Sequence, residues 1–289
     1  MRWNEPDILP IGCENSLEKY NEAFELRRWQ YDYDENDENL SDVKHIVDAL
    51  NDKGYFILKD VVDKNLLKQV RDDANKIWDE GEPTKEHFSQ LNKPDDAFQL
   101  SVKEPLYNCP STVPLIFNDI SMLVATAFFE CFPAIGTFNL RKSFVNQNVE
   151  CKETQLFHID RNCPRIMKTF MYLNDVDEDG GPFCYVEGSR KLYSKFAKPG
   201  RIPDEYVEKN YGKDNIKLLT ANMGDMIITN QTGAFHKGLK PTKNERMMLT
   251  SNWVIHSEGF HKCVMGMRQE DYDNLPDYKK PLADFLQKV

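Results

Sequence analysis

The chain has 289 residues, 40% hydrophobic and 29% charged, with a formal net charge of −10. Such a composition is typical of a globular protein with a sizeable core. The negative charge argues against nucleic acid as a partner, because phosphate backbones require clustered Lys and Arg. We expect no membrane span, since the longest near-apolar stretch, Met122 to Phe129, is too short. Seven cysteines without a CxxC pair, and no apolar secretory segment, predict a cytoplasmic protein with reduced thiols.

The first 132 residues predict a helical layer that contains one short strand. Glu18 to Gln30 can form a helix. The next helix has its apolar residues at Val43, Ile46, Val47 and Leu50, spaced as on one helical face, and Ser41-Asp42 can cap it. We expect a strand at Tyr55 to Leu58, a second amphipathic helix that opens at Asp63 and ends by Gly81, and a helix over Val113 to Cys131.

After residue 132 the pattern changes to short runs of strand length separated by turn residues. We count eight predicted strands: 135–147, 153–160, 165–173, 182–187, 216–221, 225–229, 234–239 and 246–255. Eight strands preceded by helices predict a mainly β fold, a double-stranded β-helix (jelly-roll, cupin-like) barrel. We therefore expect a single domain over 1–289, with a helical N-terminal layer at 1–132, a jelly-roll core at 133–256 and a C-terminal tail at 257–289. A short helix is expected near Pro203, in the long connection 190–215.

The tripeptide His158-Ile159-Asp160 is the first candidate for chemistry. In an extended strand, residues i and i+2 point to the same face, so His158 and Asp160 would enter one pocket. An imidazole and a carboxylate are two of the three ligands of the facial triad in non-haem Fe(II) oxygenases. The tripeptide alone is a weak signal, because a surface His beside an Asp is common.

A facial triad needs a second histidine, and His236 is the best placed. His45 and His87 lie in the helical region, and His256 and His261 lie at or beyond the last predicted strand. His236 enters the seventh predicted strand. If the chain reverses about Pro241, His236 lies directly across from Arg246. The Arg246 guanidinium would then enter the same pocket, where it could hold a carboxylate through two parallel hydrogen bonds.

Taken together, these motifs resemble the phytanoyl-CoA dioxygenase family of Fe(II)- and 2-oxoglutarate-dependent oxygenases. The likeness covers roughly residues 43 to 256, through GYFIL at 54–58, HID at 158–160, YLNDVDEDGGPFCYVEGSRK at 172–191, GD at 224–225, HxG at 236–238 and Arg246. It implies that His158, Asp160 and His236 are the iron ligands, and that Arg246 holds the distal carboxylate of 2-oxoglutarate. A Ser often found two residues after the second His is replaced here by Gly238. Gln155, Tyr172 and Thr169 are therefore candidates for secondary contacts to the co-substrate.

The resemblance implies a dioxygenase that uses Fe(II), 2-oxoglutarate and O2 and releases succinate and CO2 as it oxidises a small molecule. Asp160 favours hydroxylation, because related halogenating enzymes have Ala or Gly at that place; desaturation and ring closure stay open. Between residues 141 and 168 there are six bases and three acids, which could attract an anionic substrate or form ordinary solvated strand edges. Substrate identity and oligomeric state are not indicated.

Two other classes of function stay open at this point. One is a non-catalytic jelly-roll protein that binds a ligand. The other is a cupin-type metal hydrolase or isomerase, which would not need Arg246.

Overall fold

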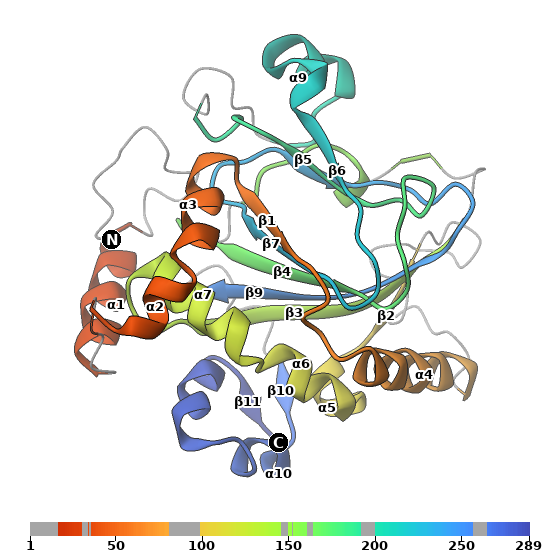
Figure 1. Cartoon of the computed structure of the whole chain (residues 1–289). Coiled ribbons are helices and arrows are strands. Elements are labelled where there is room, and N and C mark those ends of the chain that lie inside the picture. The colour runs from red at the N-terminus through yellow and green to blue at the C-terminus, as the bar shows by residue number, and fades with distance from the viewer. Residues whose placement is uncertain are drawn as a thin grey trace.

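The structure is a computed structural model that describes residues 17–30, 34, 36–80, 99–145, 150–151, 153–160, 164–191, 200–256 and 265–289. It combines helices with two antiparallel sheets, and the helices cover one face of the larger sheet (Figure 1). The expectation of a mainly β chain was too strong, because helices contribute a full layer of the core. Tyr20, Leu50 and Phe128, for example, lie in three different helices and are buried in the same hydrophobic cluster as the large sheet.

The large sheet has six strands in the order β1-β7-β4-β9-β3-β2, and every neighbouring pair is antiparallel. Its strands are β1 (Tyr55–Leu58), β2 (Gln99–Val102), β3 (Ala134–Ser143), β4 (Met167–Tyr172), β7 (Met226–Asn230) and β9 (Arg246–Val254). The small sheet has the order β6-β5-β8, with β5 at Phe183–Val186, β6 at Ile216–Leu219 and β8 at His236–Gly238. A separate parallel pair joins β10 (Gly266–Met267) to β11 (Gln287–Lys288).

Alternation along β3 and β9 gives the large sheet two different faces. Leu140 and Leu249, which are directly paired, belong to the main core under the helices. The intervening residues Arg141, Met248 and Thr250 line a cavity on the opposite face. Successive side chains of a strand point to opposite faces, so the same two strands build both the core and the wall of the cavity.

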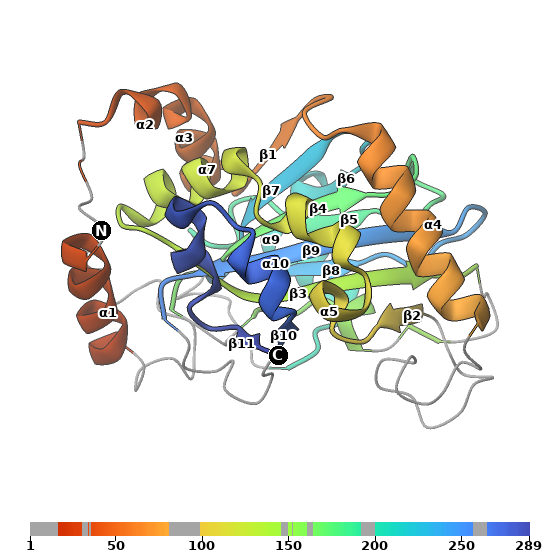
Figure 2. The same cartoon turned by 90° about the horizontal axis from the view of Figure 1, so that it is seen from below.

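The helices are α1 (Leu17–Gln30), α2 (Glu38–Asp42), α3 (Lys44–Asp52), α4 (Lys64–Glu80), α5 (Pro105–Asn108), α6 (Val113–Ile116), α7 (Asp119–Phe129), α9 (Asp204–Tyr211) and α10 (Gln269–Asp273). Helix α3 contacts β1 and β7, and α7 contacts β4. Viewed from below, the C-terminal elements β10, β11 and α10 lie on the same side of the large sheet as α5 and α7 (Figure 2). None of the described helices alone is long and apolar enough to cross a membrane; one bent pair, Pro110–Ile116 with Asp119–Phe129, reaches that length and composition together.

Seven of the eight strands predicted after residue 132 correspond to strands β3 to β9. The remaining prediction, a strand over 153–160, was wrong. Residues Glu153–Gln155 form a 3-10 helix, and Glu153 has a φ of 49°, which an extended strand does not allow. Only isolated bridges at Phe157 and His158 remain of the expected strand. Strand β2 was not predicted.

The helices predicted at 18–30, from Val43, from Asp63 and near Pro203 correspond to α1, α3, α4 and α9. Two other details of the helix predictions need correction. The stretch 113–131 is broken into α6 and α7, because the Asn118 side chain accepts a hydrogen bond from the Ser121 backbone N–H at 2.8 Å and starts a new helix. Ser41-Asp42 does not cap α3, since both residues lie inside α2. Asp63 does open α4, and its Oδ1 accepts from the Asn65 N–H at 2.8 Å.

Candidate metal centre

His158 and His236 are brought together by their backbones. The two residues form an isolated antiparallel bridge in which each N–H donates to the other's carbonyl oxygen, both at 3.1 Å. Their rings therefore lie side by side, with centroids 4.4 Å apart. Asp160 follows His158 by two residues, and its oxygens lie 3.7 Å from His158 Nε2 and 3.6 Å from His236 Nε2. Within the described part of the chain, this is the one group of His, Cys, Asp or Glu whose ligand atoms could share a metal ion, all within 4.8 Å of one another.

The orientation of both imidazoles fits a metal. His158 Nδ1 lies 2.8 Å from the Leu156 carbonyl oxygen, and His236 Nδ1 lies 3.0 Å from the Ala234 carbonyl oxygen. A carbonyl can only accept, so each Nδ1 carries the hydrogen and each Nε2 presents its lone pair toward Asp160. Metal-binding histidines are commonly fixed in this way. Burial lowers the pKa of His236 to about 3 and also lowers the pKa of His158, which keeps both rings in the neutral form that a metal requires.

The Asp160 carboxylate is held in its charged form. Burial by itself would raise the pKa of Asp160, but the positive charge of Lys168 beside it outweighs burial and holds the pKa well below its usual range. Lys168 Nζ lies 2.6 Å from Asp160 Oδ2. Two neutral imidazoles and one carboxylate are the donor set of the 2-His-1-carboxylate facial triad. The side chains present therefore fit a divalent metal ion.

The three side chains open into a cavity of about 170 Å³ between the two sheets. Its other described lining residues come from both sheets and from the chain segment before Phe157: Gln99, Asn139, Arg141, Thr154, Lys168, Phe170, Phe183, Gly238, Arg246, Met248, Thr250 and Asn252. Apart from Asp160, none of these described residues is acidic.

Arg246 lines this cavity, although the hairpin predicted to bring it there is wrong. His236 in β8 pairs with Tyr185 of β5 in the small sheet. Arg246 begins β9 in the large sheet, directly across from Ser143 of β3. The chain reversal near Pro241 thus carries the backbone from one sheet to the other instead of folding a hairpin. Arg246 and His236 face the same cavity because the two sheets face each other across it.

The Arg246 guanidinium is buried against neutral groups. It donates to the carbonyl oxygens of Gly181 and Leu239, and its Nη2 lies 3.2 Å from Ser143 Oγ. Gly181 has a φ of 68°, and a Cβ there would lie 2.6 Å from the backbone nitrogen of Pro241, so only glycine fits this contact. A Cβ at Gly238 would lie 3.6 Å from Arg246 Nη2. The resemblance noted above places a Ser at the position of Gly238. In this chain the hydroxyl beside the guanidinium comes from Ser143 instead.

The three secondary candidates do not line the cavity. Thr169 is buried on the opposite side of β4, where its Oγ1 accepts from the Trp253 indole at 3.4 Å. The Tyr172 hydroxyl donates to the Leu219 carbonyl and accepts from the Phe183 N–H, so backbone groups occupy it. Gln155 is buried, and the cavity is lined instead by its neighbour Thr154.

The polar residues of the cavity on β3 and β9 other than Arg246 were not predicted as site residues, although Arg141 was among the six bases counted between residues 141 and 168. Asn139 and Arg141 line the cavity from β3, two residues apart and in step with Ser143, which contacts Arg246, and Thr250 and Asn252 continue the alternation from Arg246 along β9. Along β9 the signal was the period of two, because the residues at even spacing from Arg246 face the same side as Arg246. The β3 residues could be placed only from the β3–β9 register.

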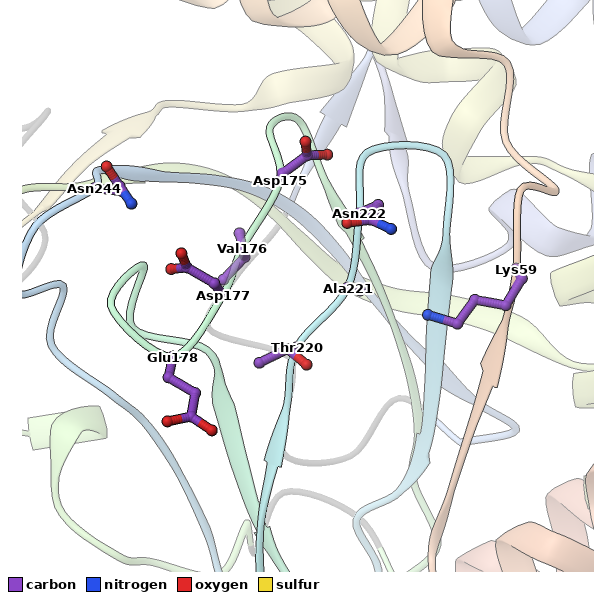
Figure 3. Close-up of a pocket in the computed structure, with 9 residues that line it drawn as sticks. All are labelled: Lys59, Asp175, Val176, Asp177, Glu178, Thr220, Ala221, Asn222 and Asn244. Carbon is purple, nitrogen blue, oxygen red and sulfur yellow. The ribbon is translucent and has the colours of Figure 1, made fainter.

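A larger pocket, of about 440 Å³, lies at the other end of the sheets, where the β4–β5, β6–β7 and β8–β9 connections meet. Its carboxylates do not converge on a single point (Figure 3). Asp175 accepts a hydrogen bond from the Met223 N–H at 2.8 Å, and Lys59 is paired with Asp225 at 2.8 Å. These groups stabilise turns, and we place no chemistry in this pocket.

The chain thus has a large antiparallel sheet, a smaller sheet that faces it, and a His-Asp-His group between the two sheets. Known structures that share this fold include two non-haem, α-ketoglutarate (2-oxoglutarate)-dependent enzymes. The carbocyclase SnoK from nogalamycin biosynthesis is 15% identical with a TM-score of 0.58, over 73% of this chain and 83% of SnoK. The epimerase SnoN, solved with Fe3+, α-ketoglutarate and nogalamycin RO, is 11% identical with a TM-score of 0.55, over 74% and 84%.

HygX from Streptomyces hygroscopicus, solved with nickel, 2-oxoglutarate and hygromycin B, is 12% identical with a TM-score of 0.50, over 73% of this chain and 86% of HygX. No family model and no curated protein sequence matches the chain. At these identities the comparisons establish a shared fold. They do not confirm the phytanoyl-CoA dioxygenase family itself.

Proposed function

We propose that this chain is an Fe(II)- and 2-oxoglutarate-dependent dioxygenase that hydroxylates a small-molecule substrate and releases succinate and CO2. The observation that carries the proposal is the buried group of His158, Asp160 and His236, with both Nε2 atoms turned toward the carboxylate, in the same cavity as the buried guanidinium of Arg246. The fold similarity to enzymes solved with a metal ion and 2-oxoglutarate supports it.

Each side chain has a role in this proposal. His158, Asp160 and His236 hold the metal ion and leave coordination positions open on the cavity side. When bound, Fe(II) would supply the activation of O2 that is coupled to decarboxylation of 2-oxoglutarate. Arg246 binds the distal carboxylate of 2-oxoglutarate through its fork of N–H donors. Ser143, already in contact with Arg246 Nη2, adds a hydroxyl to that carboxylate site.

The finer parts of the proposal rest on the sequence. We infer a jelly-roll arrangement of the two sheets in one oxygenase domain, of the phytanoyl-CoA dioxygenase type and cytoplasmic. The ring centroid of Phe183 lies 5.5 Å from that of His236, and Phe170 packs against Phe183. These two apolar side chains would exclude water from the reacting centre. A metal hydrolase, or an isomerase that does not bind 2-oxoglutarate, would not require a buried guanidinium placed to bind a second carboxylate.

The test begins with binding. Anaerobic Fe(II) enzyme is titrated with 2-oxoglutarate, and the charge-transfer absorption of the chelate is followed. Turnover of 2-oxoglutarate to succinate is then measured with O2 and a panel of small metabolites. Asp160→Ala should lose both the charge-transfer absorption and the formation of succinate. His45→Ala should retain both, because His45 is a histidine on α3 outside the cavity. If the wild-type enzyme gives neither signal, the proposal is wrong, and a non-catalytic ligand-binding role or a metal hydrolase becomes the better explanation.

A further inference from the structure

The cavity contains more positive charge than the proposed co-substrate can neutralise. Three of its described lining residues are cationic, Arg141, Lys168 and Arg246, and the one acidic residue among them is Asp160. Lys168 is paired with Asp160 at 2.6 Å. A metal ion bound by the His-Asp-His group would add two further positive charges. The two carboxylates of 2-oxoglutarate, one at the metal and one at Arg246, leave Arg141 without a counter-charge.

Arg141 has no carboxylate partner among the described residues. Its Nη2 donates to Asn139 Oδ1 at 3.0 Å, a neutral contact to its own strand. Within the part of the chain that the structure describes, its buried Nε has no hydrogen-bond partner, and the same is true of Nε of Arg246. Burial, followed by the positive charge of Arg246, lowers the pKa of Arg141 to about 10. Arg141 is half-buried, and a buried donor of a cation that has no hydrogen-bond partner costs free energy, which an anion bound in the cavity would recover.

The position of Arg141 separates it from the carboxylate site at Arg246. In the β3–β9 register, Ser143 lies across from Arg246, and Arg141 lies across from Met248. Arg141 is thus one step of two residues, roughly 7 Å, along the cavity wall from the Ser143–Arg246 pair. In the large sheet β9 lies between β3 and β4. Arg141 is on β3, whereas Lys168, which pairs with Asp160, is on β4.

Beyond Arg141 and the Met248 side chain across from it, the wall is polar. Asn139, Thr250 and Asn252 line the cavity in succession beyond it on β3 and β9. These side chains can donate and accept hydrogen bonds, so this wall suits a polar, acidic molecule better than an acyl chain. Of the apolar residues of the cavity, Phe170 and Phe183 lie on β4 and β5, and Met248 lies across from Arg141 on β9.

We propose that Arg141 forms a second anion subsite in this cavity and binds a carboxylate of the primary substrate. The substrate class is therefore a small polar acid, oriented by the guanidinium of Arg141 while Arg246 holds the co-substrate. This inference rests on the proposed function, since it assumes that 2-oxoglutarate occupies the site at Arg246.

The test uses acetate and its neutral isostere acetamide as probes. Thermal unfolding of the full chain is followed in the presence of Ni(II) and saturating 2-oxoglutarate, at constant ionic strength. Acetate should raise the unfolding temperature of the wild-type enzyme more than acetamide does. Arg141→Met, which keeps the apolar stem, should lose this difference, and Arg141→Lys should keep part of it. If acetate and acetamide shift the unfolding temperature of the wild-type enzyme equally, the proposal is overturned, even if both variants fail to fold. It is also overturned if the difference between the two shifts is as large in Arg141→Met as in the wild type.

A second readout separates the two carboxylate sites. The dissociation constant of 2-oxoglutarate is measured by anaerobic charge-transfer titration with Fe(II). It should change less than threefold in Arg141→Met, whereas Arg246→Met should raise it at least tenfold. A tenfold loss in Arg141→Met would place Arg141 in the 2-oxoglutarate site and overturn the inference. If the wild-type enzyme gives no 2-oxoglutarate signal at all, the proposed function fails first, which is a distinguishable outcome.

Discussion

Lys168 Nζ lies 2.6 Å from Asp160 Oδ2, and both side chains are more than four-fifths buried. The lysine supplies the positive charge that stabilises the carboxylate while no metal ion is bound. The two imidazoles that face the same carboxylate are neutral, so they cannot supply that charge themselves. The stability of the metal-free protein and the readiness of Asp160 to bind a metal are therefore linked through one lysine.

Lys168→Met should destabilise the metal-free protein by roughly 1–3 kcal/mol, because it leaves a buried carboxylate without a cation. Ni(II) should reduce that loss, since the bound ion replaces the missing charge. Urea unfolding with and without Ni(II) measures both quantities. Lys191→Met is the matched control: it removes an equally short pair, to Asp52 at 2.7 Å, whose side chains are 58% and 77% exposed, and should cost less than about 1 kcal/mol in either state. A loss in Lys168→Met that is the same with and without metal would contradict this link.

His158→Ala, Asp160→Ala and His236→Ala should each abolish substrate oxidation, since three protein ligands are the full facial set. The side chains sit at a cavity, so the variants should keep the wild-type circular dichroism. Metal content after Fe(II) loading and desalting, together with succinate formation, provides the measurement. Wild-type turnover in His236→Ala would move the third ligand to His256 or to His261, which is outside the described residues.

The strands around the cavity could be predicted because their apolar runs are short and bounded by turn residues. Met167–Tyr172 and Met226–Asn230 are examples that the structure places close to the predicted positions. The sheet to which each strand belongs could not be predicted. His236 pairs with Tyr185 and Arg246 with Ser143, and local spacing carries no information on such distant partners. The hairpin between His236 and Arg246 was wrong for this reason.

The candidate site was predicted better than the backbone that builds it. His158 and Asp160 were expected to share a pocket because of a strand, and they do lie together. The backbone there is a single bridge to His236 rather than a strand. Thr169 failed as a candidate because the parity of β4 turns it away from the cavity, and the sequence alone does not reveal which parity faces inward. Arg141 needed the β3–β9 register before it could be placed beside Arg246.

The metal-free protein should lose stability as the pH falls below 6.5. Burial lowers the pKa of His236 to about 3, so between pH 6.5 and 3 the unfolded chain binds a proton at this residue that the folded chain does not. Stability therefore rises with pH across that window, and His236 alone should cost roughly 2 kcal/mol by pH 5. His236→Gln should flatten this part of the pH profile of urea unfolding, whereas His45→Gln should leave the slope unchanged. An unaltered slope in His236→Gln would mean that the buried imidazole is protonated in the folded state.

Zn(II), Co(II) and Ni(II) should inhibit the enzyme by occupying the His-Asp-His group. Two imidazoles and a carboxylate bind several divalent ions, and the general affinity order places these three above Fe(II). None of them is expected to support the O2 chemistry. Succinate formation is measured after each ion is added to iron-loaded enzyme, and again after chelation and reloading with Fe(II), which should restore it. Full activity in Zn(II)-loaded enzyme with the iron removed would count against an iron oxygenase.

Arg246→Met should separate co-substrate binding from metal binding. The substitution keeps most of the side-chain length but removes the fork of donors that the distal carboxylate needs. Hydrogen bonds to charged groups contribute about 1.5–3 kcal/mol, so the affinity for 2-oxoglutarate should fall by roughly ten- to a hundredfold. Metal affinity should change little, because Arg246 is not among the three ligands.

The controls for this last prediction come from the contacts of Arg246. Its donors also bind the carbonyls of Gly181 and Leu239, so Arg246→Met is expected to be less stable and must be assayed well below its unfolding temperature. Ser143→Ala, which removes only the hydroxyl beside Nη2, should weaken 2-oxoglutarate binding by a smaller factor. The affinity for 2-oxo acids that lack the distal carboxylate should fall much less in Arg246→Met than the affinity for 2-oxoglutarate. Unchanged saturation by 2-oxoglutarate in Arg246→Met would mean that another base of the cavity holds the co-substrate, with Lys168 and Arg141 the two to test next.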